Sequence, residues 1–446
     1  MDMNHYGQEM YQLAKRLFPI CRSITGNGVR ETLDILSEIV PIRKYEVPTG
    51  TAVFDWTVPQ EWNIRGGFIE DETSKRILDF AWNNLSIVGY SEPVDQVISK
   101  EELLEHVYSE PAQPDAIPYV TSYYKRRYGF CMTENQRKTL GKGPFHVVID
   151  SELKDGSLTY GEIVLTGESE QEIFLSTYIC HPSMANDNLS GPCVLIYLAK
   201  MLSELPHRRY TYRMIFIPET IGAITYLSRN YIHLKEHVVA GFNISCVGDD
   251  RAYSYVASRY GDTLADKAAK NILSFHAPDY KSYGFLQRGS DERQYCAPGI
   301  DLPLCAICRS KYGEYPEYHT SLDNLSLISE TGLGGALDVY WKCLMGLEHN
   351  YYYCVTCLCE PQLGKRGLYP TLSRKGSYHD VQAMTNFIAY ADGSNDLFDI
   401  SNMIRVPTER LIKIADTLQT AGLLERGQNK KKSYKAERKD NNGIFN

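Results

Sequence analysis

The sequence predicts an α/β fold: a mixed, mostly parallel sheet flanked by helices, interrupted by a small β-rich insertion and followed by a C-terminal winged helix-turn-helix. From residue 172 to 310, apolar strand-like runs alternate with segments of helical periodicity, which is typical of parallel strands joined by helices. A stretch rich in Trp, Tyr and Pro breaks this alternation between residues 56 and 140. After about residue 365 the pattern changes to three short helices. These observations predict a discontinuous α/β body at 1–55 and 141–355, an inserted β-rich domain at 56–140, and a winged-helix domain at 365–435.

The body is predicted to begin with amphipathic helices over residues 5–41. Its first buried strand is expected at 172–180, and a helix follows because apolar residues recur there at three- and four-residue spacing. The segments on either side of the insertion are predicted to add strands and a hairpin to the same sheet. The remaining predicted elements are strands at 212–219, 238–248 and 302–309, helices at 189–205, 223–237 and 262–275, and the flanking segments at 45–54 and 145–167.

The C-terminal part predicts three consecutive helices, at 379–393, 397–406 and 407–424. Pro407 suits the first turn of the third helix, and Gly422 lies near its end, where glycine commonly terminates a helix. Three short helices followed by a Leu-Leu pair and a basic tail are typical of a winged helix-turn-helix.

Length and composition exclude several classes of protein. The 446 residues exceed what one core needs, and 43% of them are hydrophobic, so most of the chain is expected to fold. No run approaches the ~18 consecutive apolar residues of a membrane span, and the N-terminal residues lack the pattern of a secretory signal. We therefore expect a cytoplasmic protein without membrane contact. The formal net charge of −8 at pH 7 argues against nucleic-acid binding along the whole chain.

The twelve cysteines are expected to be reduced thiols rather than a disulfide framework. Cys305 with Cys308, and Cys354 with Cys357, are spaced like halves of a zinc site. Residues 309–353 separate the two pairs, whereas ~15–20 residues are usual between such halves. The first pair also lies in an apolar strand-like run, so a structural zinc site is not favoured there.

Four polar residues follow predicted strands of the body: His181, Asp187, Glu219 and His319. Each alone has an ordinary interpretation, because Asp187 could cap a helix and Glu219 could be a solvated strand end. The carboxyl ends of parallel strands meet at one edge of a sheet, so we expect the four to converge. Two histidines and an aspartate suit zinc, and a nearby glutamate that is not a ligand suits a general base.

Three segments resemble the co-catalytic zinc aminopeptidases of the bacterial leucyl aminopeptidase and glutamate carboxypeptidase type: HPSMANDNLSGPCVLIYLAKML, IFIPETIGAITYL and YHTSLDN. The resemblance covers roughly residues 1–55 and 140–350 and implies a zinc-aminopeptidase-like fold. It implies that His181 and His319 are zinc ligands, with Asp187 as the central carboxylate. It further implies Glu219 as the general base for a zinc-activated water and Tyr318 as a donor to the tetrahedral intermediate.

The SDER segment is a weaker match to the substrate-facing part of such enzymes and implies that Asp291 and Arg293 bind substrate. Two positions depart from the family pattern, because Thr220 stands where a second glutamate ligand is expected and Asn243 where a second aspartate ligand is expected. Two dications sharing one carboxylate would repel each other strongly. We therefore expect one zinc ion, with Asp249 as a weak candidate to replace a missing carboxylate.

The whole architecture resembles a narrower bacterial group of aminopeptidase-like proteins with an inserted β-rich domain and a C-terminal winged helix. Its members often carry only domain-of-unknown-function labels, and the group is associated with surface-polysaccharide gene clusters. The segments that carry this resemblance are FPICRSITGNGVRETL, SYYKRRYGFC and CVGDDRAYSYVASRYG.

The leading hypothesis is a zinc-dependent, aminopeptidase-like hydrolase of amide or peptide bonds that acts on a small peptide or amide. One alternative is a catalytically degenerate metal-binding or regulatory protein linked to surface-polysaccharide biosynthesis, which Thr220 and Asn243 favour. The sequence leaves open whether the chain forms a homo-oligomer.

A second alternative is a DNA-binding regulator acting through the winged helix. Between Arg426 and Lys439 there are seven basic residues and one acidic residue, a pattern that could contact phosphates. Helix 407–424 contains only two basic residues, Arg410 and Lys413. A helix that recognises a DNA sequence needs side chains that donate hydrogen bonds to the edges of the bases. We therefore favour a solvated tail and a winged helix that packs against the body or a protein partner.

Overall fold

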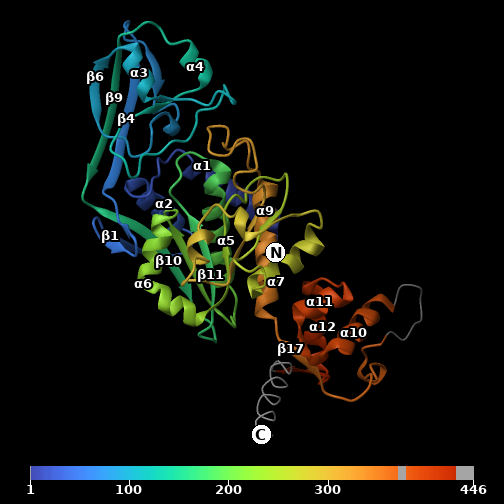
Figure 1. Cartoon of the computed structure of the whole chain (residues 1–446). Coiled ribbons are helices and arrows are strands. Elements are labelled where there is room, and N and C mark those ends of the chain that lie inside the picture. Colours follow the sequence, from blue (N-terminus) through green and yellow to red (C-terminus); the bar gives the residue numbers. More distant parts are fainter. Residues whose placement is uncertain (1, 370–377, 428–446) are drawn as a thin grey trace, which may run out of the picture. The chain divides into compact units, whose positions relative to one another are not determined.

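The computed structural model describes residues 2–369 and 378–427, and the chain divides into two compact units (Figure 1). Unit 1 comprises Met1–Asp266 and Tyr280–Asp338, and unit 2 comprises Lys267–Asp279 and Val339–Asn446. Unit 1 contains the α/β body and the inserted sheet, and unit 2 contains the C-terminal helices.

The body is built on an eight-stranded mixed sheet with the order β1-β10-β12-β11-β13-β16-β14-β15. The central strand β11 pairs in parallel with β12 and β13, and β13 pairs in parallel with β16, while the outer pairs include antiparallel ones. Every residue of β11 is buried, as expected for a strand covered on both faces. The α/β prediction is confirmed. The strands are β1 (Arg43–Pro48), β10 (Ser157–Leu165), β11 (Glu172–Tyr178), β12 (Thr211–Ile217), β13 (Val238–Asn243), β14 (Ser254–Val256), β15 (Lys281–Tyr283) and β16 (Leu304–Cys308).

Helices of unit 1 flank this sheet (Figure 1). The helix after β11 is almost wholly buried and contacts both the N-terminal helix and β11, so it lies inside a layer rather than at the surface. The unit boundaries fall within the helices that begin at Leu264 and Glu330. The helices are α1 (Met3–Leu17), α2 (Asn27–Ser37), the single turn η2 (Ala185–Leu189), α5 (Ser190–Ser203), α6 (Ile221–His237), α7 (Leu264–His276), α8 (Glu292–Tyr295) and α9 (Glu330–Glu348).

The insertion contains a four-stranded antiparallel sheet with the order β5-β4-β9-β6. Its own core includes Phe145, Val147 and Ile149, which lie on one face of β9. The expected hairpin over 145–167 is therefore divided: β9 pairs in the small sheet and β10 pairs in the large one. The elements are β4 (Glu61–Glu70), β5 (Arg76–Asp79), β6 (Val94–Ile98) and β9 (Phe145–Lys154), with β2 (Ala52–Val53), β3 (Trp56–Thr57), η1 (Asn84–Ser86), α3 (Lys100–His106), β7 (Val107–Tyr108), β8 (Phe130–Cys131) and α4 (Glu134–Lys138).

Unit 2 contains a three-stranded sheet with the order β18-β17-β19 and three helices packed around one apolar core. The three expected helices are all present. Residues 428–446, which hold most of the basic tail, lie outside the described residues. The elements are β17 (Tyr352–Val355), α10 (Tyr378–Tyr390), β18 (Asp392–Asp396), α11 (Leu397–Ile404), α12 (Thr408–Thr420) and β19 (Leu424–Gly427).

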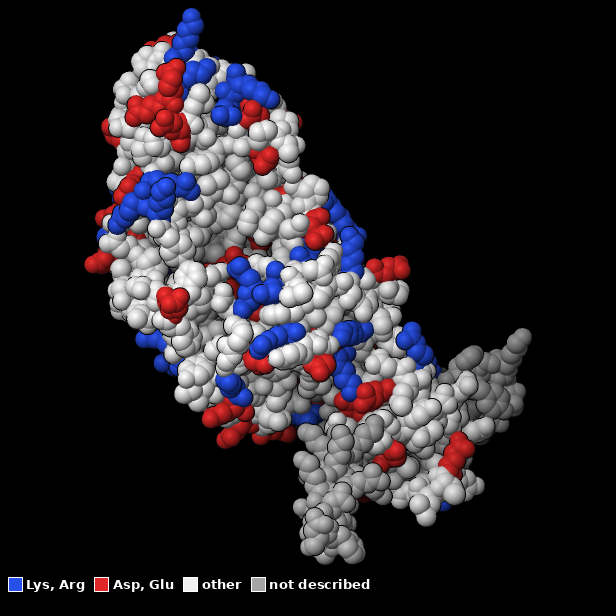
Figure 2. Space-filling view, in the orientation of Figure 1, with Lys and Arg blue, Asp and Glu red and all other residues white. Residues whose placement is uncertain are grey.

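Two further expectations concern membranes and disulfides. No helix within the described ranges is long and apolar enough to cross a bilayer. None of the twelve cysteines, which all lie in described segments, forms a disulfide, and most are buried. Basic and acidic side chains are interspersed on the visible face of the molecule (Figure 2).

Candidate metal centre

Three potential ligands converge at the carboxyl edge of the large sheet. His181 follows β11, Asp187 lies in the turn η2 that leads into α5, and His319 lies in the loop after β16. One nitrogen or oxygen of each residue lies within 4.8 Å of the corresponding atoms of the other two. Nε2 of His319 is 3.0 Å from Oδ2 of Asp187, and Nε2 of His181 is 4.0 Å from the same oxygen.

The protonation and hydrogen bonding of these residues fit a cation. Asp187 is completely buried, and its Oδ2 and Nε2 of His319 have no hydrogen-bond partner beyond the 3.0 Å ion pair that they form with each other. Leaving a buried polar atom without a partner costs about 1–3 kcal/mol, which a bound cation would offset. Burial lowers the pKa of His181 to about 4, which keeps its imidazole neutral at pH 7. A neutral imidazole and a carboxylate are the forms that bind zinc.

Two residues hold the Asp187 carboxylate in position. The hydroxyl of Tyr178, at the end of β11, donates to Oδ1 of Asp187. Burial opposes the charge on Asp187, but the two histidines and this hydrogen bond lower its pKa to about 2. Asp323 fixes the η2 turn, because its carboxylate accepts from the backbone N–H of Asn186 at 2.6 Å and of Asp187 at 2.9 Å. The carboxylate therefore faces the histidines in its ionised form.

His181 is anchored from the N-terminal segment of the chain. Its carbonyl oxygen accepts a 2.9 Å hydrogen bond from Nε of the buried Arg22, and Nη1 of Arg22 donates to the carbonyl of Leu17. Nδ1 of His181 lies 3.3 Å from Sγ of Cys180, and the same sulfur accepts from the backbone N–H of Glu219 at 3.2 Å. Cys180 thus connects the segment after β11, which carries His181, to the segment after β12, which carries Glu219.

Glu219 lies beside the three residues without being one of them. Its Oε2 is 3.8 Å from Nε2 of His181, and its side chain is 22% exposed. Burial raises the pKa of Glu219 well above its ordinary value, with Asp291 and Asp187 adding to the rise and Arg293 opposing it. A carboxyl group with a raised pKa at an accessible site is suited to accept and return a proton.

Tyr318 lies flat against His319. The ring centroids are 3.9 Å apart with an angle of 13° between the ring planes, and His319 has a left-handed backbone conformation with φ of 56°. Burial raises the pKa of Tyr318, so its hydroxyl stays protonated and can donate a hydrogen bond. All four residues expected at the sheet edge, together with Tyr318, are thus neighbours.

The two positions without the expected carboxylates are engaged in hydrogen bonds. The backbone N–H of Thr220 donates to Oδ1 of Asp291 at 2.7 Å, and Nη2 of Arg293 donates to Oγ1 of Thr220 at 3.1 Å. Nδ2 of Asn243 donates to Oε2 of Glu292 at 3.0 Å. Within the described part of the chain, His181, Asp187 and His319 form the one cluster of three or more potential metal ligands.

Asp249 is not near an open coordination position. Its Oδ2 accepts from Nδ2 of Asn186 at 3.1 Å and from the backbone N–H of Ser310 at 2.8 Å. Its Oδ1 accepts from the Ser310 hydroxyl at 2.8 Å. These bonds connect the η2 turn to the loop after β16, so Asp249 supports the site structurally.

Sequence reasoning missed Tyr178, Asp323 and Tyr119 as parts of this site. Tyr178 lies three residues before His181, and Asp323 lies in the same motif as His319. The motifs could therefore have indicated both residues. The ring of Tyr119 lies 5.2 Å from the rings of both His181 and His319. No local pattern marks Tyr119, because it comes from the insertion.

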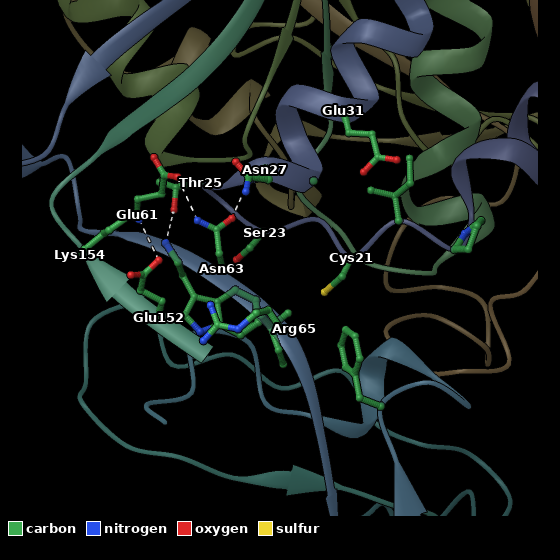
Figure 3. Close-up of a pocket in the computed structure, with 16 residues that line it drawn as sticks. Cys21, Ser23, Thr25, Asn27, Glu31, Glu61, Asn63, Arg65, Glu152 and Lys154 are labelled. Carbon is green, nitrogen blue, oxygen red and sulfur yellow. Dashed lines mark hydrogen bonds and ion pairs between the residues drawn. The ribbon is translucent and has the colours of Figure 1, made fainter. Parts of the chain in front are cut away.

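A separate cavity of about 610 Å³ lies between the loop before α2 and strands β4 and β9 (Figure 3). Its walls are largely polar, and the guanidinium of Arg30 forms a two-bond pair with the Glu61 carboxylate at 2.8 and 2.6 Å beside it. The residues that line it do not include the three potential metal ligands or Glu219.

In unit 2, residues at the N-terminal end of α12 form a hydrogen bond and an ion pair with residues of α7. The Thr408 hydroxyl donates to Oδ1 of Asn271 on α7 at 2.6 Å, and Glu409 forms an ion pair with His276 at 2.6 Å. α11 and α12 form the helix-turn-helix, in which the N-terminal residues of the second helix would enter a DNA groove. Here those residues contact α7 instead.

Comparisons with known proteins agree with the two-part organisation. Residues 11–350 match the family model described as "Domain of unknown function (DUF4910)", and residues 350–426 match one described as a winged helix-turn-helix. A protein of Clostridium acetobutylicum named "Putative polysaccharide biosynthesis protein with aminopeptidase-like domain" is 44% identical over 421 residues, which cover 94% of this chain and 96% of the relative.

Solved structures show the same fold. A crystal structure of a "putative peptidase" from Clostridium acetobutylicum is 43% identical with a TM-score of 0.90, covering 95% of this chain and 97% of that one. A zinc aminopeptidase from Bacillus subtilis is 12% identical with a TM-score of 0.55, covering 77% of this chain and 94% of that one. The second likeness shows the aminopeptidase-like fold, as the sequence motifs predicted.

Proposed function

This chain belongs to the family described as domain of unknown function DUF4910, and from that premise we propose that it is a zinc-dependent hydrolase of amide or peptide bonds. One observation carries the proposal: His181, Asp187 and His319 direct ligand atoms to one point, with Glu219 beside them. Three protein ligands and an open position are typical of catalytic rather than structural zinc sites. The zinc aminopeptidase fold supports the proposal.

The proposed roles follow from the contacts. A zinc ion at such a site supplies Lewis acidity toward water and toward a substrate carbonyl. Glu219 accepts the proton of the attacking water and returns it to the leaving amine, for which its raised pKa suits it. Tyr318 donates a hydrogen bond to the developing oxyanion. Arg293 and Asp291, beside Glu219, bind the polar end of the substrate.

We propose one zinc ion rather than two. Thr220 and Asn243 each lack a carboxylate, and both make hydrogen bonds to neighbouring protein groups. The relative from Clostridium acetobutylicum carries polysaccharide biosynthesis in its name, so amides of amino sugars belong beside aminoacyl amides among the candidate substrates.

The test combines metal analysis with one substitution. Purified protein should contain about one equivalent of zinc, and Glu219→Gln should retain the zinc while losing about 10²- to 10⁴-fold in turnover. Glu314→Gln, at an exposed glutamate in the loop after β16, serves as the control and should keep full activity. A protein without zinc, or equal turnover by Glu219→Gln and wild type on aminoacyl and amino-sugar amides, would refute the proposal.

The same panel separates hydrolysis from the degenerate alternative. If zinc is bound stoichiometrically but no amide is turned over, the centre is a metal-binding site in a regulatory protein. The absence of carboxylates at Thr220 and Asn243 is consistent with that outcome. Glu219-dependent turnover excludes that alternative.

We propose that the winged helix serves intramolecular or protein contacts rather than DNA reading. Thr408 and Glu409 are held by α7, and α12 contributes few basic residues. A gel-shift titration with random duplex DNA should show no complex at physiological salt, and a salt-sensitive complex would reverse this proposal. Cytoplasmic localisation and homo-oligomer formation stay predictions.

A further inference from the structure

The inserted domain contacts both histidine-bearing loops of the body. Nδ2 of Asn84, in η1 of the insertion, donates to the hydroxyl of Ser183 at 2.7 Å, two residues after His181. On the other side, the backbone N–H of Tyr119 donates to the carbonyl of His319 at 2.9 Å. The two loops that carry the histidines are therefore both tied to the insertion.

The contact with the His319 loop continues over several residues. The backbone N–H of Ser321 donates to the carbonyl of Ile117 at 2.9 Å, and the Ser321 hydroxyl accepts from the backbone N–H of Ile117 at 3.0 Å. Pro118 and Thr320 form an antiparallel bridge between these bonds. The segment Ile117–Tyr119 thus runs alongside the His319 loop like an added strand and fixes its course.

The side chain of Tyr119 reaches the metal centre itself. Its ring is tilted by 45° to the ring of His181 and by 82° to that of His319, with both centroids 5.2 Å away. The two histidine rings are 5.5 Å apart, so one aromatic ring contacts both. The Tyr119 hydroxyl is paired with that of Tyr123 at 2.8 Å, and the Tyr123 ring packs edge-on against Tyr90 at 5.2 Å.

We propose that the insertion is part of the active site and that Tyr119 is a positioning residue for both histidine ligands. The inference rests on the proposed zinc function. Histidine ligands depend on surrounding contacts for their ring orientation, and removal of such a contact typically lowers metal affinity about 10- to 100-fold.

The ring contacts, rather than the hydroxyl, are expected to carry this role. The hydroxyl of Tyr119 bonds to Tyr123 and not to a histidine, so its removal leaves both ring contacts in place. Tyr119→Phe should therefore behave like wild type toward metal. Tyr119→Ala removes the ring, and Tyr119→Leu fills most of the space without an aromatic face.

The experiment uses Co²⁺ as the probe, because its visible absorption spectrum reports the geometry of the coordinating atoms. Tyr119→Ala should bind Co²⁺ about 10- to 100-fold more weakly than wild type and with an altered spectrum. Tyr119→Leu should shift the spectrum in the same direction, which keeps the test informative if Tyr119→Ala fails to fold. Tyr124→Ala is the control, since Tyr124 belongs to the same segment but is 64% exposed and contacts Trp56.

The outcomes separate this inference from the proposed function. If wild type binds Co²⁺ and folded Tyr119→Ala or Tyr119→Leu binds it with the same affinity and spectrum, the inference is wrong and the zinc centre stands. If Tyr124→Ala has the same effect as Tyr119→Ala, the role is general stability of the segment, and the inference is also wrong. If wild type binds neither Co²⁺ nor Zn²⁺, the proposed function fails and the inference fails with it.

Discussion

The two sides of the candidate site differ in how their buried polar atoms are used. On one side, Oδ2 of Asp187 and Nε2 of His319 are 3.0 Å apart and have no hydrogen-bond partner beyond this ion pair. On the other side, Nδ2 of Asn243 donates to Ser290 and to Glu292, and Oγ1 of Thr220 accepts from Arg293. Buried polar atoms are normally paired, so the close pair on the first side marks where a ligand is expected. On the second side, protein groups hold the side chains of Thr220 and Asn243, although Oδ2 of the buried Asp291 has no hydrogen-bond partner.

This difference gives the proposed single zinc ion a physical basis. Thr220, at a position where the family resemblance implies a ligand of a second ion, instead accepts a hydrogen bond from Arg293, whose positive charge lies next to Glu219.

Removing a ligand from the first side should have the largest effect. His319→Ala leaves two protein ligands, which is fewer than a catalytic zinc site needs, so zinc content should fall to background and amide hydrolysis should be lost. Elemental analysis after dialysis measures the first effect. His207→Ala, at a histidine whose side chain is 84% exposed, is the control and should retain zinc. Full zinc content in His319→Ala would remove the distinction between the two sides.

A carboxylate placed on the second side should destabilise the fold. Asn243→Asp replaces a donor by a charge 3.0 Å from Oε2 of Glu292, and both residues are completely buried. We expect the free energy of unfolding to fall by about 3 kcal/mol at pH 7. Denaturant unfolding with and without zinc measures it. Asn243→Ala, which loses the donor without adding charge, should lose less. Recovery of the stability of Asn243→Asp by a second equivalent of zinc would show that the second metal position can be restored.

Removing the positive charge from the second side should move the pH profile. Arg293 lowers the pKa of Glu219, so Arg293→Gln should raise that pKa. Because Glu219 must be ionised to accept a proton, the acidic limb of kcat/KM should move to higher pH. Arg288→Gln, at an exposed arginine before the same segment, should leave the profile unchanged. A shift to lower pH would contradict the assigned role of the guanidinium group.

The smallest effect is expected at a fully paired carboxylate outside the site. The hydrogen bonds from Arg30 lower the pKa of Glu61 to about 2. A lowered pKa stabilises the fold above the ordinary value near pH 4.5, and that stabilisation is lost as the pH falls toward 2. Glu61→Gln should therefore be less stable than wild type at pH 7 by about 1–2 kcal/mol. The difference between the two proteins should disappear near pH 2, and thermal unfolding across this pH range measures both effects.

Local patterns were sufficient to predict most of the body and the convergence of the three candidate ligands. The strand β11 and the helix α5 have uninterrupted apolar periodicity, and the polar residues after each strand follow from the rule that parallel strand ends share one edge. His181 and Asp187 are six residues apart, and His319 lies in a recognisable motif. Thr220 and Asn243 were identified as departures from the sequence alone, and their hydrogen bonds show how the protein accommodates them.

The remainder depends on contacts between distant segments. Tyr119 lies about 200 residues from His319 along the chain, and nothing near it in the sequence indicates that it reaches the centre. The division of the 145–167 segment was also not predictable from its pattern. β9 buries alternate residues and β10 is buried along most of its length, but neither pattern indicates which sheet the strand joins. Arg22 was missed for the same reason, since a lone arginine in a loop gives no signal of its buried contact with His181.

The direct continuation of β9 into β10 limits how this protein can be shortened. The chain leaves the small sheet at Lys154 and enters the large sheet at Ser157, so the exit from the insertion is itself a strand junction rather than a loop. Excising the small sheet would leave β10 paired with β1 and β12 but would remove the strand that leads directly into it. A minimal version of the body would need a new turn before Ser157, and it would also lack the ring of Tyr119 beside the two histidines.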